Sequence, residues 1–185
     1  MDFHLAFSPE RVSPGDPVYK TRKTPEVVVV GTPRCGEAAA TLYERIIEGG
    51  VHTISSTRAA KMTTLLENTF RIINISFVNE LAQLCERMGI DVWEVIAASS
   101  TKPFGLMPFY PDPGLGGHCI PLDSFYLSWK AKEFEFTTQF IEMAGRINDA
   151  VLRCGASHGG SESGRAGAQW REHLVARHDV QVSCR

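Results

Sequence analysis

The sequence lacks the features of a secreted, membrane-spanning or zinc-binding protein. Its five cysteines are odd in number, irregularly spaced and include no CxxC pair, which argues against a disulfide framework or a zinc site. The N-terminus has no basic stretch followed by an apolar run, and no apolar run approaches the roughly 18–20 residues of a membrane span. The formal net charge is −2 without a dense Lys/Arg stripe, and the six histidines suggest no metal cluster. We therefore expect a cytoplasmic protein with no metal, nucleic-acid or membrane partner.

The composition is that of a globular chain with one domain and part of a second. Hydrophobic residues make up 43% of the 185 residues and charged residues 22%, which suffices for a packed core over most of the length. The residue pattern changes twice, which predicts three zones: 1–55, 56–150 and 151–185. Their elements predict an α+β, mainly α fold.

The first zone has the pattern of a strand–helix–strand unit. Residues 3–7 are predicted to form a short strand, and the β-branched run 27–30 a strand buried on both faces of a parallel sheet. Thr32 and Pro33 suit the start of a helix, which is strongest over 38–47 and ends at Gly49-Gly50. Residues 51–54 are a further strand candidate. One such βαβ unit is too small to be a stable sheet alone.

The second zone is dominated by a long predicted helix. Residues 57–88 contain no Pro and no Gly, which allows a helix of about 30 residues and about 45 Å. Its apolar residues cover more than one face, so the helix should be buried on several sides, with a second chain as a plausible source of that burial. Asp91 is predicted to cap a short helix that ends at Ala98.

A long loop and two more helices complete the second zone. The stretch 101–117 contains four prolines and four glycines, and loops of this length in compact domains are usually functional. Helices are predicted over 123–132 and 137–148. The third zone is rich in glycine and shows no sustained helical or strand period, so irregular chain is expected from residue 151 onward.

The segment 114–123, GLGGHCIPLD, carries the clearest chemical signal. Glycines let the backbone approach a ligand closely and expose N–H groups to phosphate oxygens. Cys119 follows these glycines and Asp123 comes four residues later, a pattern that suits a nucleophile with a nearby polar partner. Taken alone, the residues also fit a structural loop in which Cys119 is an inert thiol. Asp123 also fits the N-cap of the next helix.

Residues 2–149 resemble the nucleotide-sugar 6-dehydrogenases, which act on UDP-glucose, UDP-N-acetylglucosamine or UDP-N-acetylmannosamine. Four stretches carry the resemblance in the family's order: DFHLAFSPERVSPG (2–15), LLENTFRIINISFVNE (65–80), GIDVWE (89–94) and TKPFGLMPFYPDPGLGGHCIPLDSFYLSW (101–129). In such enzymes a cofactor domain precedes a helical dimerisation domain and a nucleotide-sugar-binding domain. The resemblance thus implies that 1–55 is the C-terminal βαβ remnant of a Rossmann-type NAD-binding domain. Zone 56–150 would be an all-α dimerisation domain with one long central helix. The chain would therefore form a homodimer.

The resemblance also implies an activity. An NAD-dependent oxidoreductase of polysaccharide precursor synthesis would oxidise the C6 alcohol of a UDP-sugar, here a UDP-N-acetylhexosamine, to a carboxylate. The second stage would pass through a thiohemiacetal and a thioester on Cys119. By the same resemblance Asp123 and Glu10 would manage protons and water, and Asn68 would hydrogen-bond the reacting oxygen.

The family's substrate loop corresponds to 101–117 here. The substrate-binding residues that the resemblance implies are Phe104, Gly105, Tyr110, Gly114, Gly116 and Gly117. Taken alone, Glu10 is equally a loop carboxylate, and Asn68 a buried Asn with local partners. Asn79, in the same long helix, is expected to be a structural or interface polar residue. His118 receives no catalytic role.

The chain departs from the family in three places. It contains no GxGxxG turn, so the pyrophosphate site of the cofactor domain is missing from these residues. The family's lysine, four positions before the asparagine, is replaced by Thr64, and the nearest lysine, Lys61, lies about two turns from Asn68. Residues 171–181 can be encoded by codons that, read one nucleotide later, give a strand followed by glycine. That pattern resembles the start of the family's third domain. It suggests that the tail is a frameshifted reading.

These departures leave more than one hypothesis open. The first is a truncated NAD-dependent dehydrogenase, which is inactive as these 185 residues alone. The others are a catalytically dead helical dimerisation module and a gene remnant.

Overall fold

The computed structural model describes residues 5–11, 18–112 and 119–157. The chain divides into two compact units, one up to Glu67 and one from Asn68 onward, so that helix α2 (Thr57–Met88) contributes to both. Helices predominate, and the described strands form one small parallel sheet. The mainly helical composition with a small parallel sheet, as expected from the sequence, is confirmed.

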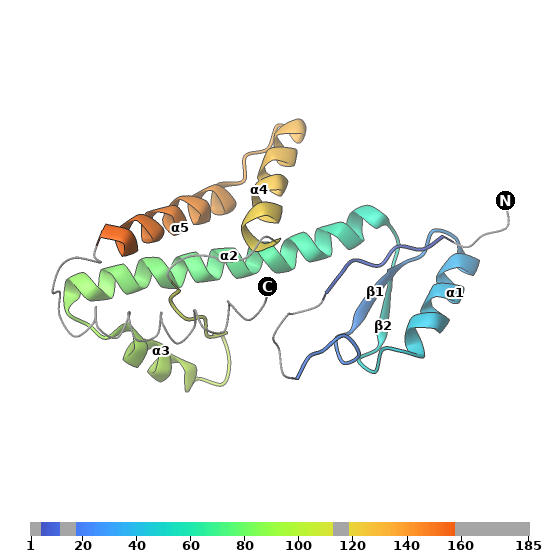
Figure 1. The fold of residues 1–185 in the computed structure, drawn as a ribbon, viewed down its shortest axis with the longest axis horizontal. Coiled ribbons are helices and arrows are strands. Elements are labelled where there is room, and N and C mark those ends of the chain that lie inside the picture. The colour runs from blue at the N-terminus through green and yellow to red at the C-terminus, as the bar shows by residue number, and fades with distance from the viewer. Residues whose placement is uncertain (1–4, 12–17, 113–118, 158–185) are drawn as a thin grey trace. The chain divides into compact units, whose positions relative to one another are not determined.

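The first unit is built around the predicted strand–helix–strand pattern (Figure 1). Strand β1 (Glu26–Val29) pairs in parallel with β2 (Val51–Ile54), and α1 (Pro33–Glu44) connects them. The three valines of β1 are buried, as a strand covered on both faces requires. The expected strand over 3–7 is reduced to a single antiparallel bridge between Phe7 and Val29, with residues 3 and 4 outside the described part.

The start of α1 follows its local signals. The Thr32 side chain accepts a hydrogen bond from Cys35 N, and Pro33 occupies the first helical position, where no amide hydrogen is needed. The helix ends at Glu44, earlier than the predicted 47, and residues 45–50 form the turn into β2. Gly49 is required there, since an added Cβ would lie 2.4 Å from the carbonyl oxygen of Lys23.

Helix α2 supplies the core of the second unit. Val78, Ala82 and Cys85 pack with Val92 and Ile96 of α3 (Val92–Ser100) in one buried cluster. The predicted cap of α3 is confirmed, because the Asp91 carboxylate accepts a hydrogen bond of 2.8 Å from Trp93 N. Both α2 boundaries agree with the helix expected over 57–88.

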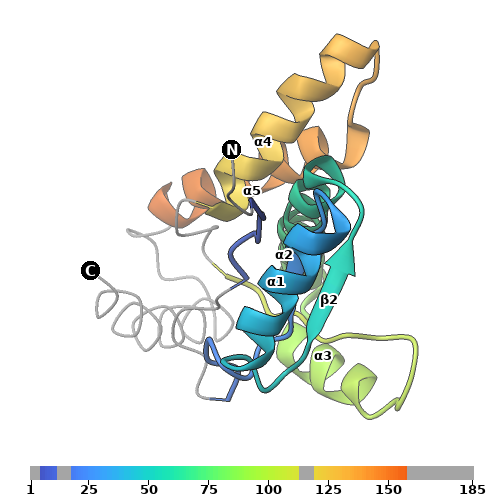
Figure 2. The same ribbon diagram turned by 90° about the vertical axis from the view of Figure 1, so that its right-hand side faces the viewer.

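The last two helices differ from expectation at their ends. Helix α4 runs over Cys119–Ala131, four residues earlier than the start predicted at Asp123, so Asp123 is not its N-cap. After the short 3₁₀ helix η1 (Lys132–Phe134), α5 runs over Gln139–Ser157 and continues past residue 150, where irregular chain was expected. Helix α5 lies beside α2 in both ribbon views (Figures 1 and 2). Gly145 permits its contact with α4, since an added Cβ would lie 2.5 Å from the ring of Phe125.

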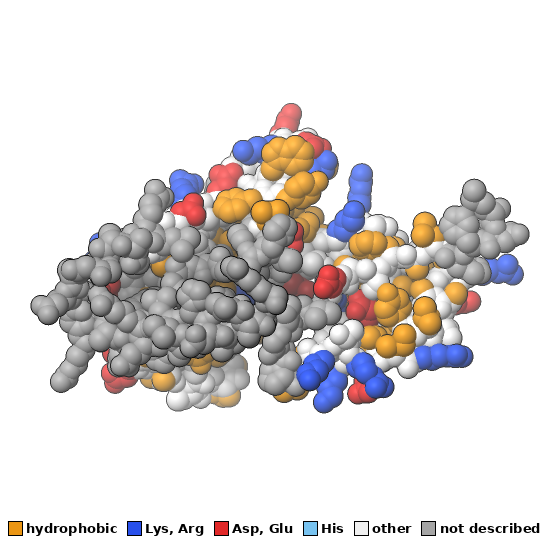
Figure 3. Space-filling view, viewed as in Figure 1, with side chains coloured by type: hydrophobic (Ala, Val, Ile, Leu, Met, Phe, Trp, Pro, Cys, Tyr) orange, Lys and Arg blue, Asp and Glu red, His pale blue; other side chains and the backbone are white. Residues whose placement is uncertain are grey.

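Large apolar side chains remain exposed on α4 of the second unit. Orange side chains gather over this helix in the space-filling view (Figure 3), where Phe125, Tyr126 and Trp129 are 45%, 59% and 58% exposed. Within the described ranges, no helix combines the length and the apolar character needed to cross a bilayer.

Candidate functional site

Two of the predicted catalytic residues are hydrogen-bonded to each other. Asn68 Nδ2, on α2, donates to Asp123 Oδ2, on α4, at 2.9 Å, although the two residues are 55 positions apart in the sequence. Both side chains are partly buried. The bond orients the Asp123 carboxylate and leaves its other oxygen to accept a proton or a water hydrogen. The pairing of these two residues is thus a tertiary feature of the second unit.

Cys119 is the first residue of α4, so its backbone lies one helical turn before Asp123. The first turn of a helix has amide groups without intrahelical acceptors, and it carries partial positive charge. Such an environment favours an anion, including a thiolate or the oxyanion of a tetrahedral adduct. The predicted ligand glycines Gly114, Gly116 and Gly117 lie outside the described residues.

The end of the 101–112 loop is attached to the helices at three points. The ring of Phe109 meets Phe70 of α2 edge-on, with 5.7 Å between centroids. Tyr110 stacks on Trp93 of α3 at 6.1 Å. The amide of Asp112 donates to Asn79 Oδ1 at 2.9 Å. The sequence did not predict Trp93 and Asn79 as site residues. Their loop partners lie at least 17 positions away along the chain, and no local pattern marks them.

The earlier part of the loop is more open. Phe104 is 69% exposed, and the Lys102 ammonium lies 4.9 Å from the centre of its ring. Gly105 has φ +79°, a left-handed conformation that favours glycine. A turn with an exposed aromatic ring and a nearby cation has groups that can contact a polar, anionic ligand.

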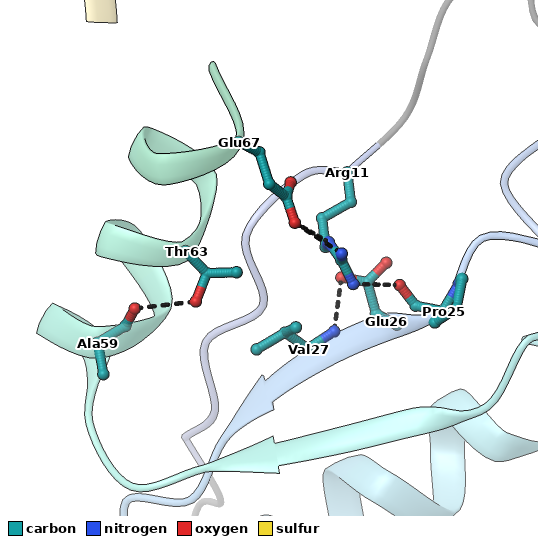
Figure 4. A network of polar contacts seen from close by, with 7 residues as sticks. All are labelled: Arg11, Pro25, Glu26, Val27, Ala59, Thr63 and Glu67. Carbon is teal, nitrogen blue, oxygen red and sulfur yellow. Dashed lines mark hydrogen bonds and ion pairs between the residues drawn. The ribbon is translucent and has the colours of Figure 1, made fainter. Parts of the chain in front are cut away.

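Glu10 belongs to the first unit and is exposed. Its neighbour Arg11 is fixed, because Nε and Nη2 both donate to Glu67 Oε1, at 3.1 and 2.6 Å, and Nη1 donates to the carbonyl of Pro25 at 2.8 Å (Figure 4). The Arg11 side chain, next to Glu10, thus links Pro25, which precedes β1, with Glu67 in α2. Among described residues no group of His, Cys, Asp and Glu could hold a metal ion.

Thr64 stands where the resemblance places a lysine. It lies one turn before Asn68 in α2, and its Oγ1 is buried with no hydrogen-bond partner in the described part of the chain. Lys61 instead places its ammonium 5.8 Å from the ring of Phe7. The positive charge expected beside the asparagine is therefore not supplied by either side chain.

Comparison with known proteins decides the family. The model of the UDP-glucose/GDP-mannose dehydrogenase family, central domain, matches residues 58–150. This chain belongs to that family. The match covers the described stretch that contains Asn68, the loop anchors and Asp123, and it ends within α5.

Individual dehydrogenases of the family are similar over most of this chain. It is 40% identical over 151 residues to a UDP-N-acetyl-D-glucosamine 6-dehydrogenase of Pseudomonas aeruginosa, covering 81% of this chain and 35% of that protein. A UDP-N-acetyl-D-mannosamine dehydrogenase of Yersinia pestis is 38% identical, with 80% and 34% covered. The solved UDP-D-ManNAc dehydrogenase of Pyrococcus horikoshii superposes with a TM-score of 0.73 at 31% identity, covering 84% of this chain and 36% of that one. The chain thus spans about a third of the length of these relatives.

Proposed function

We propose that this chain carries the cysteine-bearing central part of an NAD-dependent dehydrogenase that oxidises C6 of a UDP-sugar. The observation that carries the proposal is the Asn68–Asp123 hydrogen bond, 2.9 Å long, one helical turn from the backbone of Cys119. The names of the similar proteins, which specify acyl-amino sugars, support a UDP-N-acetylhexosamine as substrate. The product would be a uronic-acid precursor for polysaccharide synthesis.

The proposed roles follow from what each group can donate or accept. The Cys119 sulfur bonds to the carbonyl carbon of the C6 aldehyde, and the carbonyl oxygen takes up a proton, which forms a thiohemiacetal. The Asn68 amide has two N–H groups, one on Asp123 and one that can donate to the reacting oxygen. Asp123, with Glu10, would take protons and orient the water that releases the final carboxylate and returns the thiol.

NAD⁺ supplies the hydride acceptor in this proposal, on the strength of the family alone. The 185 residues contain no GxGxxG turn, and the described sheet has two strands. No residue of this chain is therefore assigned to holding the dinucleotide.

Protection of Cys119 from alkylation tests the substrate site directly. The purified chain is treated with iodoacetamide with and without UDP-N-acetylglucosamine or UDP-N-acetylmannosamine, and labelling is followed by peptide mass spectrometry. We expect labelling of Cys119 to slow about tenfold at a ligand concentration about ten times the dissociation constant, by simple occupancy. Cys35, in α1, serves as the internal reference and should be unaffected. If Cys119 is labelled as fast with each UDP-sugar, UDP-glucose included, as it is without ligand, the proposal is contradicted.

We further propose that the chain forms a homodimer through α2. Within the second unit, Phe70, Phe77 and Leu84 recur every seven residues on one face of this helix and are 46%, 60% and 52% exposed. A heptad spacing keeps an apolar seam directed at a partner helix. A hollow of about 440 Å³ lies along the same face, lined by Phe77, Leu81 and Leu84 with polar neighbours. A second copy of this face is the occupant that such a self-complementary stripe fits.

A further inference from the structure

A chain of buried hydrogen bonds crosses the second unit away from the Asn68–Asp123 pair. Asn79 and Ser76 of α2 and Asn148 of α5 are 1%, 2% and 5% exposed. Asn79 Nδ2 donates to Asn148 Oδ1 at 3.3 Å, and Asn148 Nδ2 donates to Ser76 Oγ at 2.7 Å. The Ser76 hydroxyl in turn lies 2.7 Å from the carbonyl oxygen of Ile72. Each of the three side chains thus has a buried protein partner, and the Ser76 hydroxyl also lies 3.2 Å from the carbonyl oxygen of Ala144.

The direction of this chain is fixed by its two ends. At one end is the Asp112 amide, which can only donate, and at the other is the Ile72 carbonyl, which can only accept. Asn79 must therefore present its oxygen to Asp112 and its nitrogen to Asn148. Hydrogen bonds that all run in one direction polarise one another, which strengthens the contact to the loop.

Asn79 and Asn68 are placed to hold the two ends of one segment. They are 11 residues apart in α2, which puts them about 20° apart around the helix and roughly 16 Å apart along it. Asn68 binds the Asp123 carboxylate at 2.9 Å, and Asn79 binds the Asp112 amide at 2.9 Å. Between Asp112 and Asp123 lie the glycines of the sequence motif and Cys119.

We propose that Asn79 is a positioning residue for the end of the 101–112 loop, from which the chain continues to Cys119, and that it acts through the Asp112 amide. This inference rests on the proposed UDP-sugar site and deepens it. Asn79 fixes the point at which the chain leaves the loop, as Asn68 fixes the point one turn beyond Cys119. Its buried partner Asn148 on α5 prevents the amide from rotating, so the position of the Asp112 amide depends on the packing of α5 against α2.

The first test measures the anchoring without any ligand. In the ¹⁵N-labelled 185-residue chain, Asn79→Ala and Asn79→Leu both remove the acceptor of the Asp112 amide, and Leu keeps the side-chain volume. We expect hydrogen exchange of the Asp112 amide to accelerate about tenfold, the effect of losing one buried hydrogen bond. The Ile90 amide, bonded to Cys85 O at 2.9 Å, serves as the reference and should change less than about twofold. Equal acceleration at both amides would mean general loosening and would overturn the inference.

The second test asks whether the anchor matters for the site. Protection of Cys119 from iodoacetamide by UDP-N-acetylglucosamine should fall about tenfold in both Asn79 variants. Asn74→Leu is the matched control, since Asn74 lies on the same helix and donates only to the backbone of Phe70. Unchanged protection in Asn79→Leu, or equal loss in Asn74→Leu, would overturn the positioning role. If no UDP-sugar protects Cys119 in the unmodified chain, the proposed function is contradicted. The exchange rate of the Asp112 amide would still show whether Asn79 anchors the loop.

Discussion

Two neighbouring threonines of α2 have opposite hydrogen-bonding situations. Thr63 Oγ1 donates to the carbonyl of Ala59 at 3.1 Å (Figure 4), whereas Thr64 Oγ1 is buried without a partner among the residues described. A buried hydroxyl that is not hydrogen-bonded lowers stability by about 1–3 kcal/mol. The position of Thr64, one turn before Asn68, makes it a local weak point in the helix that carries the site.

Replacement of Thr64 by valine should therefore stabilise the chain. Thr64→Val removes the unpaired hydroxyl at nearly constant volume, and we expect the free energy of unfolding to rise by about 1 kcal/mol, or the Tm by about 2–4 °C. Thr63→Val is the control and should be neutral or destabilising, because it removes a formed bond. Thermal denaturation followed by circular dichroism measures both. A lower Tm for Thr64→Val than for Thr63→Val would refute the assignment.

At the scale of elements, α3 supports the end of the 101–112 loop. Its Val92 and Ile96 pack into the α2 core, and its Trp93 stacks on Tyr110 at 6.1 Å. The helix has nine residues, a length that is not stable in water without capping and tertiary contacts. The order of the loop thus depends on a short helix and on its cap.

Removal of this cap should loosen both the helix and the loop. Asp91→Ala deletes the acceptor for Trp93 N and should lower the free energy of unfolding by about 1 kcal/mol. Asp91→Asn retains a capping oxygen and should stay within a few tenths of a kcal/mol of the original chain. Urea titration gives the stabilities, and the part of the tryptophan fluorescence that is lost in Trp93→Phe reports the stacking contact. Identical midpoints for the two variants would show that the cap contributes nothing.

At the scale of the whole molecule, the proposed homodimer would depend on the exposed stripe of α2. Phe77→Glu places a charge in the middle of the heptad seam and should convert a dimer into a monomer, because burial of an unpaired carboxylate is costly. Phe136→Glu is the matched control, since Phe136 is 63% exposed but lies between η1 and α5. Light scattering after size exclusion distinguishes the two masses. A monomeric unmodified chain would refute the homodimer.

The proposed dehydrogenase activity is also tested at the scale of the whole molecule. Because these 185 residues include no GxGxxG turn, we expect no formation of NADH when they are supplied with NAD⁺ and a UDP-sugar. The assay follows absorbance at the NADH band with UDP-N-acetylglucosamine, UDP-N-acetylmannosamine and UDP-glucose. Sustained NADH production with any of them would show that the dinucleotide is held in a way this sequence does not reveal.

Local signals in the sequence determined most of the elements of this protein. Thr32-Pro33 and Asp91 predicted two helix starts, because a cap needs only a side-chain oxygen and the next few amides. The run 57–88 without Pro or Gly predicted α2, and the β-branched run around Val28 predicted β1. The helix and strand predictions depend on residues close together in the chain. The family was predicted by resemblance of four stretches between residues 2 and 129.

Tertiary structure alone decided the start of α4, the length of α5 and the partners of the site. The sequence predicted that α4 begins at Asp123, yet Pro121 fits in the first turn of the helix, where its missing N–H would have had no acceptor. The bonds from Asn68 to Asp123 and from Asn79 to Asp112 join residues 55 and 33 positions apart. Helical periodicity reveals which face a residue occupies but not what packs against it, because the partner of a buried polar group is set by the fold and not by its neighbours in sequence.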